Sequence, residues 1–297
     1  MRYNLKIACI FAHYDNQNEV DEYVIFYLKS LKEIVQTLVF VSTSSISDSD
    51  VLQIEAIGVT VIIRENIGYD FYSYKVGLEA LSWNEYSHII ICNDSVYGPI
   101  YPLENVFKQM QATECDFWGI TSSESIGFHL QSYFLVFKKN VISAGVFKKF
   151  WEDLTIINNK FLVVKKYEVG LTKTLIANNY KSAAFVKNVK LEVSKSLRFI
   201  QLVVRLVKSP IKIFKFIKNP SRYLIAINKI KVNPSLESIK SLVVRSKSPF
   251  IKTVLFKGLE AEQNLSIVKN VIPMVSSYDY LLIKHHIARI SSPNDEL

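Results

Sequence analysis

Short apolar runs alternate with amphipathic segments over the first 190 residues. The unbroken runs lie at residues 5–12, 37–43, 59–64, 87–94, 115–121 and 132–139. Runs of this length are typical of strands that are buried on both faces. Between them, apolar residues recur at helical spacing over 20–35, 71–81 and 103–110, and a last helix is expected to begin near Glu168. A polar, serine-rich turn is expected at 44–50.

This alternation predicts an α/β domain at residues 1–190, with a Rossmann-type, mostly parallel sheet flanked by helices. Ligands of such sheets bind beyond the carboxyl ends of the strands. Polar clusters follow three of the predicted strands: His13 with Asp15, the segment 64–70, and the segment 93–95. We therefore expect a binding site at this edge of the sheet.

The chain becomes strongly basic after residue 195, and this accounts for most of its formal net charge of +9. Between Lys195 and Lys252 there are fourteen Lys or Arg residues and one acid, Glu237. A capping side chain precedes proline at 209–210, 219–220, 233–234 and 248–249, which predicts helix starts. We interpret residues 191–297 as a basic helical C-terminal region.

The basic face predicted over 198–215 adjoins an apolar face, a pattern that favours an anionic membrane surface as partner. Nucleic acid is the alternative partner. It is disfavoured because no known reader motif is present and aliphatic residues outnumber aromatic ones there. No apolar stretch of about 18 residues predicts a membrane-spanning helix.

The N-terminal apolar run and the cysteines both indicate the cytoplasm. The run at 7–12 is followed by His13 and Asp15, which predicts a strand and not a signal peptide. The three cysteines, Cys9, Cys92 and Cys115, are expected to be buried free thiols in a reducing compartment.

The fourth predicted strand ends in Asn93-Asp94-Ser95. Hard oxygen ligands at this place suit Mg²⁺ or Mn²⁺ bound to a diphosphate. The alternative is an Asx-turn that leads into Gly98-Pro99.

Polar and aromatic side chains mix in "DFWGIT" and "HLQSYFLVF", which hold Asp116, Trp118, His129, Gln131 and Ser132. Ligand pockets combine apolar walls with a few convergent polar groups, so these segments are candidates for sugar binding. A structural role for His129 and a core position for Trp118 are the alternatives. For Glu168 the alternative is favourable pairing with the dipole of the helix that it begins.

Four segments taken together are specific: "RENIGYDFYSYKVGL", "NDSVYGPI", "DFWGIT" and "HLQSYFLVF", in this order. They resemble the rhamnan synthesis protein F family of bacterial polysaccharide assembly and, more distantly, inverting glycosyltransferases of the GT-A fold. The resemblance covers about residues 5–188, and "PFIKTVLF" at 249–256 resembles the family's C-terminal element.

The resemblance implies a GT-A-like glycosyltransferase that inverts the transferred sugar. Its donor would be a nucleotide sugar, dTDP-L-rhamnose, and its acceptor a lipid-linked cell-surface polysaccharide at the inner face of the bacterial membrane. Glu168 would be the catalytic base, with Asp116 as the alternative base. Asp94 matches the metal-binding Asp-x-Asp motif and would hold Mg²⁺ or Mn²⁺, although the second acid is missing.

The resemblance and the strand ends together give the remaining site residues. The expected donor-binding residues are His13, Asp15, Arg64, Asn66, Gly68, Asp70, Lys75, Asn93, Asp94 and Ser95, and the expected acceptor- or sugar-binding residues are Trp118, His129, Gln131 and Ser132. Gly68 would let the backbone approach the donor. Asp70 would bond a donor hydroxyl or orient Arg64, and Arg64 and Lys75 would stabilise the departing diphosphate.

A second class of function stays open because the Asn-Asp-Ser motif has one carboxylate. The chain could be a non-catalytic carbohydrate-binding or scaffold subunit of a polysaccharide assembly complex.

Overall fold

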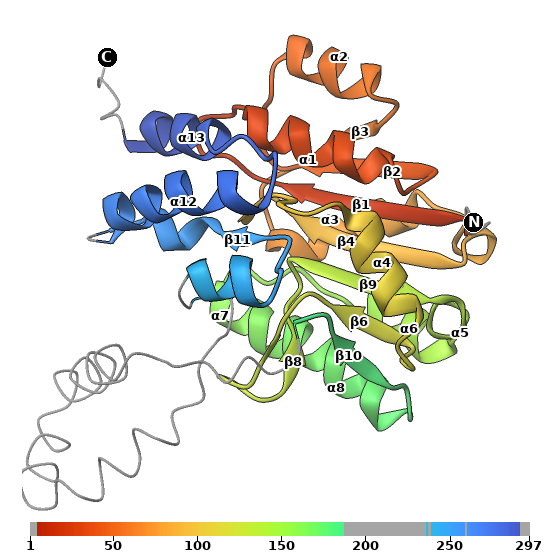
Figure 1. The fold of residues 1–297 in the computed structure, drawn as a ribbon. Helices are drawn as coiled ribbons and strands as arrows, with labels where there is room; N and C mark the ends of the chain where they lie inside the picture. The colour runs from red at the N-terminus through yellow and green to blue at the C-terminus, as the bar shows by residue number, and fades with distance from the viewer. Residues whose placement is uncertain (1–4, 187–235, 237–238, 259, 292–297) are drawn as a thin grey trace, which may run out of the picture.

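The computed structural model describes residues 5–186, 236, 239–258 and 260–291 (Figure 1). The strands are β1 (Ile7–His13), β2 (Thr37–Ser42), β3 (Thr60–Ile63), β4 (His88–Asn93), β5 (Val96–Tyr97), β6 (Phe117–Gly119), β7 (Ser122–Ser123), β8 (His129–Leu130), β9 (Phe134–Lys138), β10 (Ser182–Ala184) and β11 (Ile251–Lys252). The α-helices are α1 (Glu22–Lys32), α2 (Asp48–Ala56), α3 (Tyr69–Glu79), α4 (Leu103–Gln111), α5 (Lys139–Ile142), α6 (Gly145–Glu152), α7 (Lys160–Val163), α8 (Val169–Ala177), α12 (Ala261–Val275) and α13 (Leu281–Ser291). The π-helical turns are Val164–Glu168 and Ser241–Arg245, and the 3₁₀ turns are Trp83–Glu85 and Thr253–Phe256.

Seven strands form one sheet in the order β10-β6-β9-β4-β1-β2-β3. β1 pairs in parallel with β2 and β4, and β2 with β3. β9 alone runs antiparallel, between β4 and β6. The predicted α/β fold with a mostly parallel sheet is therefore confirmed.

Helices cover both faces of this sheet because the strand side chains are apolar in both directions (Figure 1). In β1, Cys9 and Phe11 pack toward α1, whereas Ala8 and Ile10 pack toward α3. Helix α3 lies very close to the sheet: a Cβ on Gly77 would be 2.4 Å from the Ile10 side chain. This close packing fixes the amino end of α3 at the carboxyl edge of the sheet.

The described C-terminal residues pack into the same hydrophobic core as the sheet. β11 pairs antiparallel with β5, so that Lys252 lies opposite Val96. Helices α12 and α13 contribute Val268, Ile272 and Ile283 to the core on the α1 side. A segment that begins far beyond residue 190 thus completes the carboxyl edge of the sheet.

Three local expectations differ from the structure. The polar turn at 44–50 continues into α2, because Ser47 and Asp50 form a capping box. The helix expected near Glu168 is α8, which starts at Val169, but α7 and a π-helical turn precede it without a break, so the helical run begins at Lys160. Ser248-Pro249 leads into strand β11 and not into a helix.

Two further expectations concern the cysteines and the basic segment. Cys9, Cys92 and Cys115 are buried free thiols, as predicted. The basic face at 198–215 and the capping pairs at 209–210, 219–220 and 233–234 lie outside the described residues. Among the described helices, none has the length and apolar character needed to span a membrane.

Candidate functional site

The carboxyl end of β4 presents Asp94, which is partly buried. Its Oδ2 accepts a hydrogen bond of 2.8 Å from the backbone N–H of Tyr14, and its carbonyl oxygen accepts one of 3.0 Å from the Tyr23 hydroxyl. Burial raises the pKa of Asp94 well above its usual value, and the charges of Asp70 and Asp15 raise it further. A cation placed here would relieve this electrostatic cost.

Asn93 forms the turn that was the alternative role for Asp94. Its Oδ1 accepts hydrogen bonds from the backbone N–H and the hydroxyl of Ser95, at 3.1 and 2.6 Å. Its Nδ2 donates to Asp70 Oδ2 at 2.8 Å. Asn93 therefore makes the Asx-turn and links Asp70 to the end of β4, while the Asp94 carboxylate takes no part in the turn.

Asp70 lies in the first turn of α3, and Gly68 and Tyr69 before it both have positive φ, at 73° and 55°. Gly68 has no Cβ penalty there, whereas Tyr69 is strained. Arg64 stabilises this loop, because its guanidinium donates to the carbonyl oxygens of residues 65, 67 and 69 and to Ser73. Arg64 thus holds the loop, and Asp70 bonds Asn93 and not Arg64.

A cavity of about 290 Å³ opens beside this loop. Its lining is His13, Tyr14, Thr43, Asn66, Ile67, Gly68, Tyr69, Asp70, Ser73 and Asn158. Four predicted donor-binding residues, His13, Asn66, Gly68 and Asp70, are therefore brought together. His13 is neutral at pH 7, because burial lowers its pKa to about 4.

Glu168 ends a π-helical turn between α7 and α8. Its Oε1 accepts hydrogen bonds from the backbone N–H and the hydroxyl of Ser132, at 2.6 and 2.9 Å. Its Oε2 lies 4.0 Å from Nε2 of His129. π-helical turns within α-helices occur often at functional sites. Glu168 lies mid-helix, so the alternative role at a helix N-terminus does not apply.

Charges from four distant segments act on one another at this edge. Burial raises the pKa of Asp70. The positive charges of Lys160 and Lys252 lower this pKa, and the negative charge of Glu168 raises it. Burial also lowers the pKa of Lys252 to about 8, against the opposing charges of Glu168 and Asp70. Strongly perturbed groups that gather at a strand end are candidates for a functional site. Asp70, Asp94, Glu168 and Lys252, with Asn93 and Ser95, form what we call the central cluster.

Three further predicted residues have structural partners. Lys75 donates to the carbonyl oxygens of Glu152 and Leu154, both at 3.1 Å, and so caps α6. Gln131 is buried and accepts a hydrogen bond of 2.6 Å from Thr121. His129 is buried, and its Nδ1 bonds the carbonyl oxygen of Gly127 at 2.8 Å, which leaves Nε2 toward Glu168.

The structure separates Asp116 and Trp118 from the central cluster. Asp116 precedes β6 at the amino edge of the sheet and accepts hydrogen bonds from Asn140 and from the backbone N–H of Lys181. It therefore lies at the wrong edge to replace Glu168 as the base. Trp118 is 1% exposed and packs against Phe107 in the core, so it is not available to a sugar.

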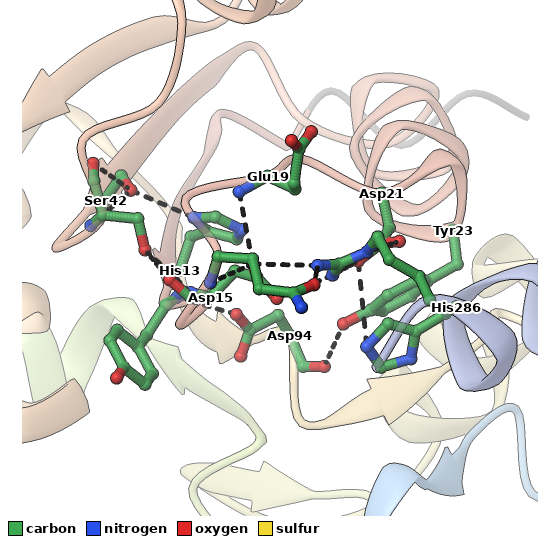
Figure 2. A network of polar contacts seen from close by, with 12 residues as sticks. His13, Asp15, Glu19, Asp21, Tyr23, Ser42, Asp94 and His286 are labelled. Atoms are coloured by element: carbon green, nitrogen blue, oxygen red, sulfur yellow. Dashed lines mark hydrogen bonds and ion pairs between the residues drawn. The ribbon is translucent and has the colours of Figure 1, made fainter. Parts of the chain in front are cut away.

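Asp15 is engaged by the C-terminal helix α13. Arg289 donates to both carboxylate oxygens of Asp15 and to both of Asp21. Figure 2 shows Asp15 and Asp21 near His286, and their ligand atoms lie within 4.8 Å of one another, as in a metal site. The guanidinium already supplies the cation there, and Asp15 does not line the cavity. The Asp15 carboxylate thus bonds Arg289 and braces the loop that carries Tyr14.

Sequence reasoning missed Lys252, Lys160 and Asn158. Asn158 Oδ1 accepts a hydrogen bond of 3.0 Å from the N–H of Gly68. Lys252 belongs to "PFIKTVLF", the C-terminal element that the resemblance singled out, and this was the one signal for it. Its position beside β4 depends on a strand pairing that no local pattern announces.

The family profile of rhamnan synthesis protein F matches residues 38–218. An uncharacterized protein, y4gN of Sinorhizobium fredii, is 30% identical over 142 residues, which are 46% of this chain and 37% of that protein. Virulence protein VirA of Vibrio anguillarum is 31% identical over 116 residues, 37% of this chain and 36% of that protein. The chain thus matches well under half the length of either relative.

Solved structures resemble the fold at low similarity. A cytidylyltransferase from Leptospira borgpetersenii has a TM-score of 0.35 and 11% identity, covering 60% of this chain and 75% of its own. Glucosyl-3-phosphoglycerate synthase from Mycobacterium tuberculosis has a TM-score of 0.35 and 13% identity, covering 46% and 58%. Scores this low bear on neither substrate nor mechanism.

Proposed function

The chain belongs to the rhamnan synthesis protein F family, and on this premise we propose that it is an inverting glycosyltransferase. The proposed donor is a nucleotide sugar, dTDP-L-rhamnose, and the proposed acceptor is a lipid-linked cell-surface polysaccharide. The observation that carries the proposal is the convergence of Glu168 with Asp70 and Asp94 at the carboxyl edge of the sheet.

Glu168 is the proposed general base. Ser132 fixes its Oε1 through two hydrogen bonds, and the other oxygen remains to accept the proton of the acceptor hydroxyl. The acceptor oxygen then forms a bond to the anomeric carbon, while the bond from that carbon to the diphosphate breaks and its electron pair leaves with the diphosphate. Attack from the face opposite the nucleotide inverts the anomeric centre.

The cavity that His13, Asn66, Gly68 and Asp70 line is the proposed donor pocket. Asp94 fits a divalent cation, because its carboxylate is a hard oxygen ligand that is desolvated beside the negative charges of Asp70 and Asp15. Mg²⁺ or Mn²⁺ bound there would neutralise charge on the diphosphate. Asp70, fixed by Asn93, is placed to accept a hydrogen bond from a donor hydroxyl.

A transfer assay on the full chain tests this function. Candidate nucleotide sugars are first screened by thermal shift, and those that bind are offered with a synthetic lipid-linked acceptor. Glu168→Gln is expected to lower turnover by about 100- to 10,000-fold with donor affinity retained, as for loss of a general base. Asp116→Asn is the matched control at the opposite edge and should leave turnover unchanged.

Two results would contradict the proposal in different ways. Near-normal turnover in Glu168→Gln would remove this residue as the base. Binding of free saccharide without binding of any nucleotide sugar would instead favour the non-catalytic subunit.

We also propose that the protein associates with the inner face of the cell membrane through its basic segment. The charge at 195–252 and the proposed lipid-linked acceptor support this partner. In liposome flotation, the protein should bind vesicles that contain anionic lipid and not neutral ones. Equal binding to both kinds of vesicle would contradict the electrostatic model.

A further inference from the structure

Lys252 enters the central cluster from the far end of the chain and is held there rigidly. Strand β11 pairs with β5, which begins two residues after Asp94. The next residue, Thr253, donates its backbone N–H and its hydroxyl to the carbonyl oxygen of Ser95, at 3.0 and 3.2 Å. The backbone on both sides of the lysine is therefore fixed to the turn that carries Asp94.

The ammonium of Lys252 has weak partners. Its Nζ donates to Ser95 Oγ at 3.4 Å and lies 4.2 Å from the ring centroid of Tyr133. Within the part of the chain that the structure describes, no ion pair joins it to a carboxylate. Asp70 and Glu168 act on it from a longer range, as does the like charge of Lys160. A desolvated cation without a direct counter-ion is costly, and an incoming anion would offset that cost.

The partner of Lys252, Ser95, belongs to the Asn93-Asp94-Ser95 motif. Asn93-Asp94-Ser95 has one carboxylate where the Asp-x-Asp pattern has two, and Ser95 directly follows Asp94. The Ser95 hydroxyl accepts a hydrogen bond from the Lys252 ammonium. A positive charge therefore lies beside the residue next to Asp94, in a motif that lacks a second acid.

We propose that Lys252 is a further catalytic residue, whose ammonium binds a non-bridging oxygen of the donor diphosphate and stabilises the diphosphate as it leaves. The inference rests on the proposed sugar transfer. Lys252 keeps its proton throughout: the acceptor proton goes to Glu168, and the electron pair of the breaking bond goes to the diphosphate. The ammonium supplies part of the charge that a weakly held cation at Asp94 would otherwise supply alone.

The test is calorimetric titration of UDP, dTDP, GDP and CDP into the full chain in the presence of EDTA. Each nucleoside monophosphate is titrated in parallel. For the nucleoside whose diphosphate binds the wild-type chain, Lys252→Met should lower the affinity for the diphosphate at least tenfold. The affinity for the corresponding monophosphate should fall much less. The control Lys257→Met removes an exposed lysine of the same segment and should change neither.

Two readouts separate this role from a structural one. Wild-type diphosphate affinity should fall between pH 7 and pH 9, as Lys252 loses its proton among Asp70, Glu168 and Lys160. Lys252→Arg should retain most of the affinity and lose that pH dependence, because a guanidinium stays charged. The thermal midpoint of Lys252→Met should stay near the wild-type value.

Unchanged diphosphate affinity in Lys252→Met, with wild-type binding intact, would overturn the role of Lys252 and leave the proposed function standing. A loss of affinity in Lys252→Met that Lys252→Arg does not restore, together with a lower thermal midpoint, would also overturn it. If none of the four diphosphates binds the wild-type chain with or without Mg²⁺ or Mn²⁺, the proposed function itself fails.

Discussion

Both edges of the central sheet carry charged groups, but these groups differ in how far they are exposed to water. At the amino edge, Lys6 and Glu85 form an ion pair of 2.6 Å with both side chains at least half exposed, and Glu114 pairs with Lys181 in the open. At the carboxyl edge, burial shifts the pKa of Asp70, Asp94 and Lys252, and these groups do not pair with one another directly.

The difference in exposure between the two edges shows that the presence of charged residues alone does not identify the site. Asp116 was a plausible base from its sequence, yet it lies at the solvated edge with its hydrogen bonds satisfied. The carboxyl edge is covered by β11 and α13, so its charged groups are removed from water and have strong fields on one another.

The largest expected effect is common to both edges and comes from two buried histidines, His13 at the carboxyl edge and His88 at the amino edge. Burial lowers the pKa of each to about 4, from 6.5. The unfolded chain therefore takes up a proton at each histidine before the folded chain does, so stability falls as the pH drops from about 6.5 to about 4. Each should cost about 3 kcal/mol at pH 4, about 6 together.

Urea unfolding at pH 7, 5.5 and 4 measures this loss. His13→Asn and His88→Asn keep a hydrogen-bonding group near the position of Nδ1, and each should reduce the loss of stability between pH 7 and pH 4 by about 3 kcal/mol. An unchanged pH dependence in His88→Asn would mean that the His88 side chain is not buried as described.

The second effect concerns Arg289, which joins α13 to Asp15 and Asp21. Its side chain is 24% exposed and those of the two acids are 10% and 13% exposed. Arg289→Met leaves two desolvated carboxylates without a counter-ion and should lower the free energy of unfolding by about 3 kcal/mol. Lys181→Met at the amino edge breaks an exposed ion pair and should have no measurable effect. Equal losses in the two variants would erase the contrast between the edges.

The third effect is on donor binding at Asp94. Asp94→Asn keeps an oxygen for the N–H of Tyr14 but removes the charge. Donor affinity should become independent of Mg²⁺ and Mn²⁺ and fall about tenfold in their presence, in line with loss of a charged contact. Calorimetry with metal and with chelator measures this, and Asp116→Asn serves as the matched control. Metal-independent affinity that is equal in Asp94→Asn and the wild type would exclude Asp94 from a metal site.

The smallest effect is expected at the amino edge, from Glu85→Gln. This substitution removes one partner of the exposed Lys6–Glu85 pair, which water screens strongly. The urea midpoint at low and at high salt should match that of the wild type within experimental error. A clear, salt-dependent drop would show that exposed pairs at this edge contribute more than solvent screening allows.

Local patterns predicted most of the sheet and part of the site. The strands were found because residues buried on both faces form continuous apolar runs. Helix α2 was missed although its signal, Ser47-Asp48-Ser49-Asp50, is a capping-box sequence. The start at Lys160 was missed because Asn159 caps it in a segment without a regular apolar period.

Some of the site residues could likewise be grouped from the sequence, whereas the partners of others could not be predicted. Asp70, Asn93 and Asp94 follow strands whose parallel order puts their carboxyl ends together, so the sequence was enough to group them. Asp15 follows β1 just as closely, but a residue 274 positions away engages its carboxylate. The end of a predicted strand therefore indicates at which edge of the sheet a side chain lies. It does not indicate which partner the side chain contacts.

The sequence by itself determined the sheet, its helical layers and the edge at which polar residues gather. Apolar runs indicate which strands are buried, and the alternation of strands with helices indicates that the strands run parallel. Only the tertiary structure decided which of those polar groups are desolvated. Lys252 reaches Ser95 across 157 positions, and Ser132 holds Glu168 across 36. Contacts between segments so far apart depend on how the whole core packs, and no short stretch of sequence encodes them.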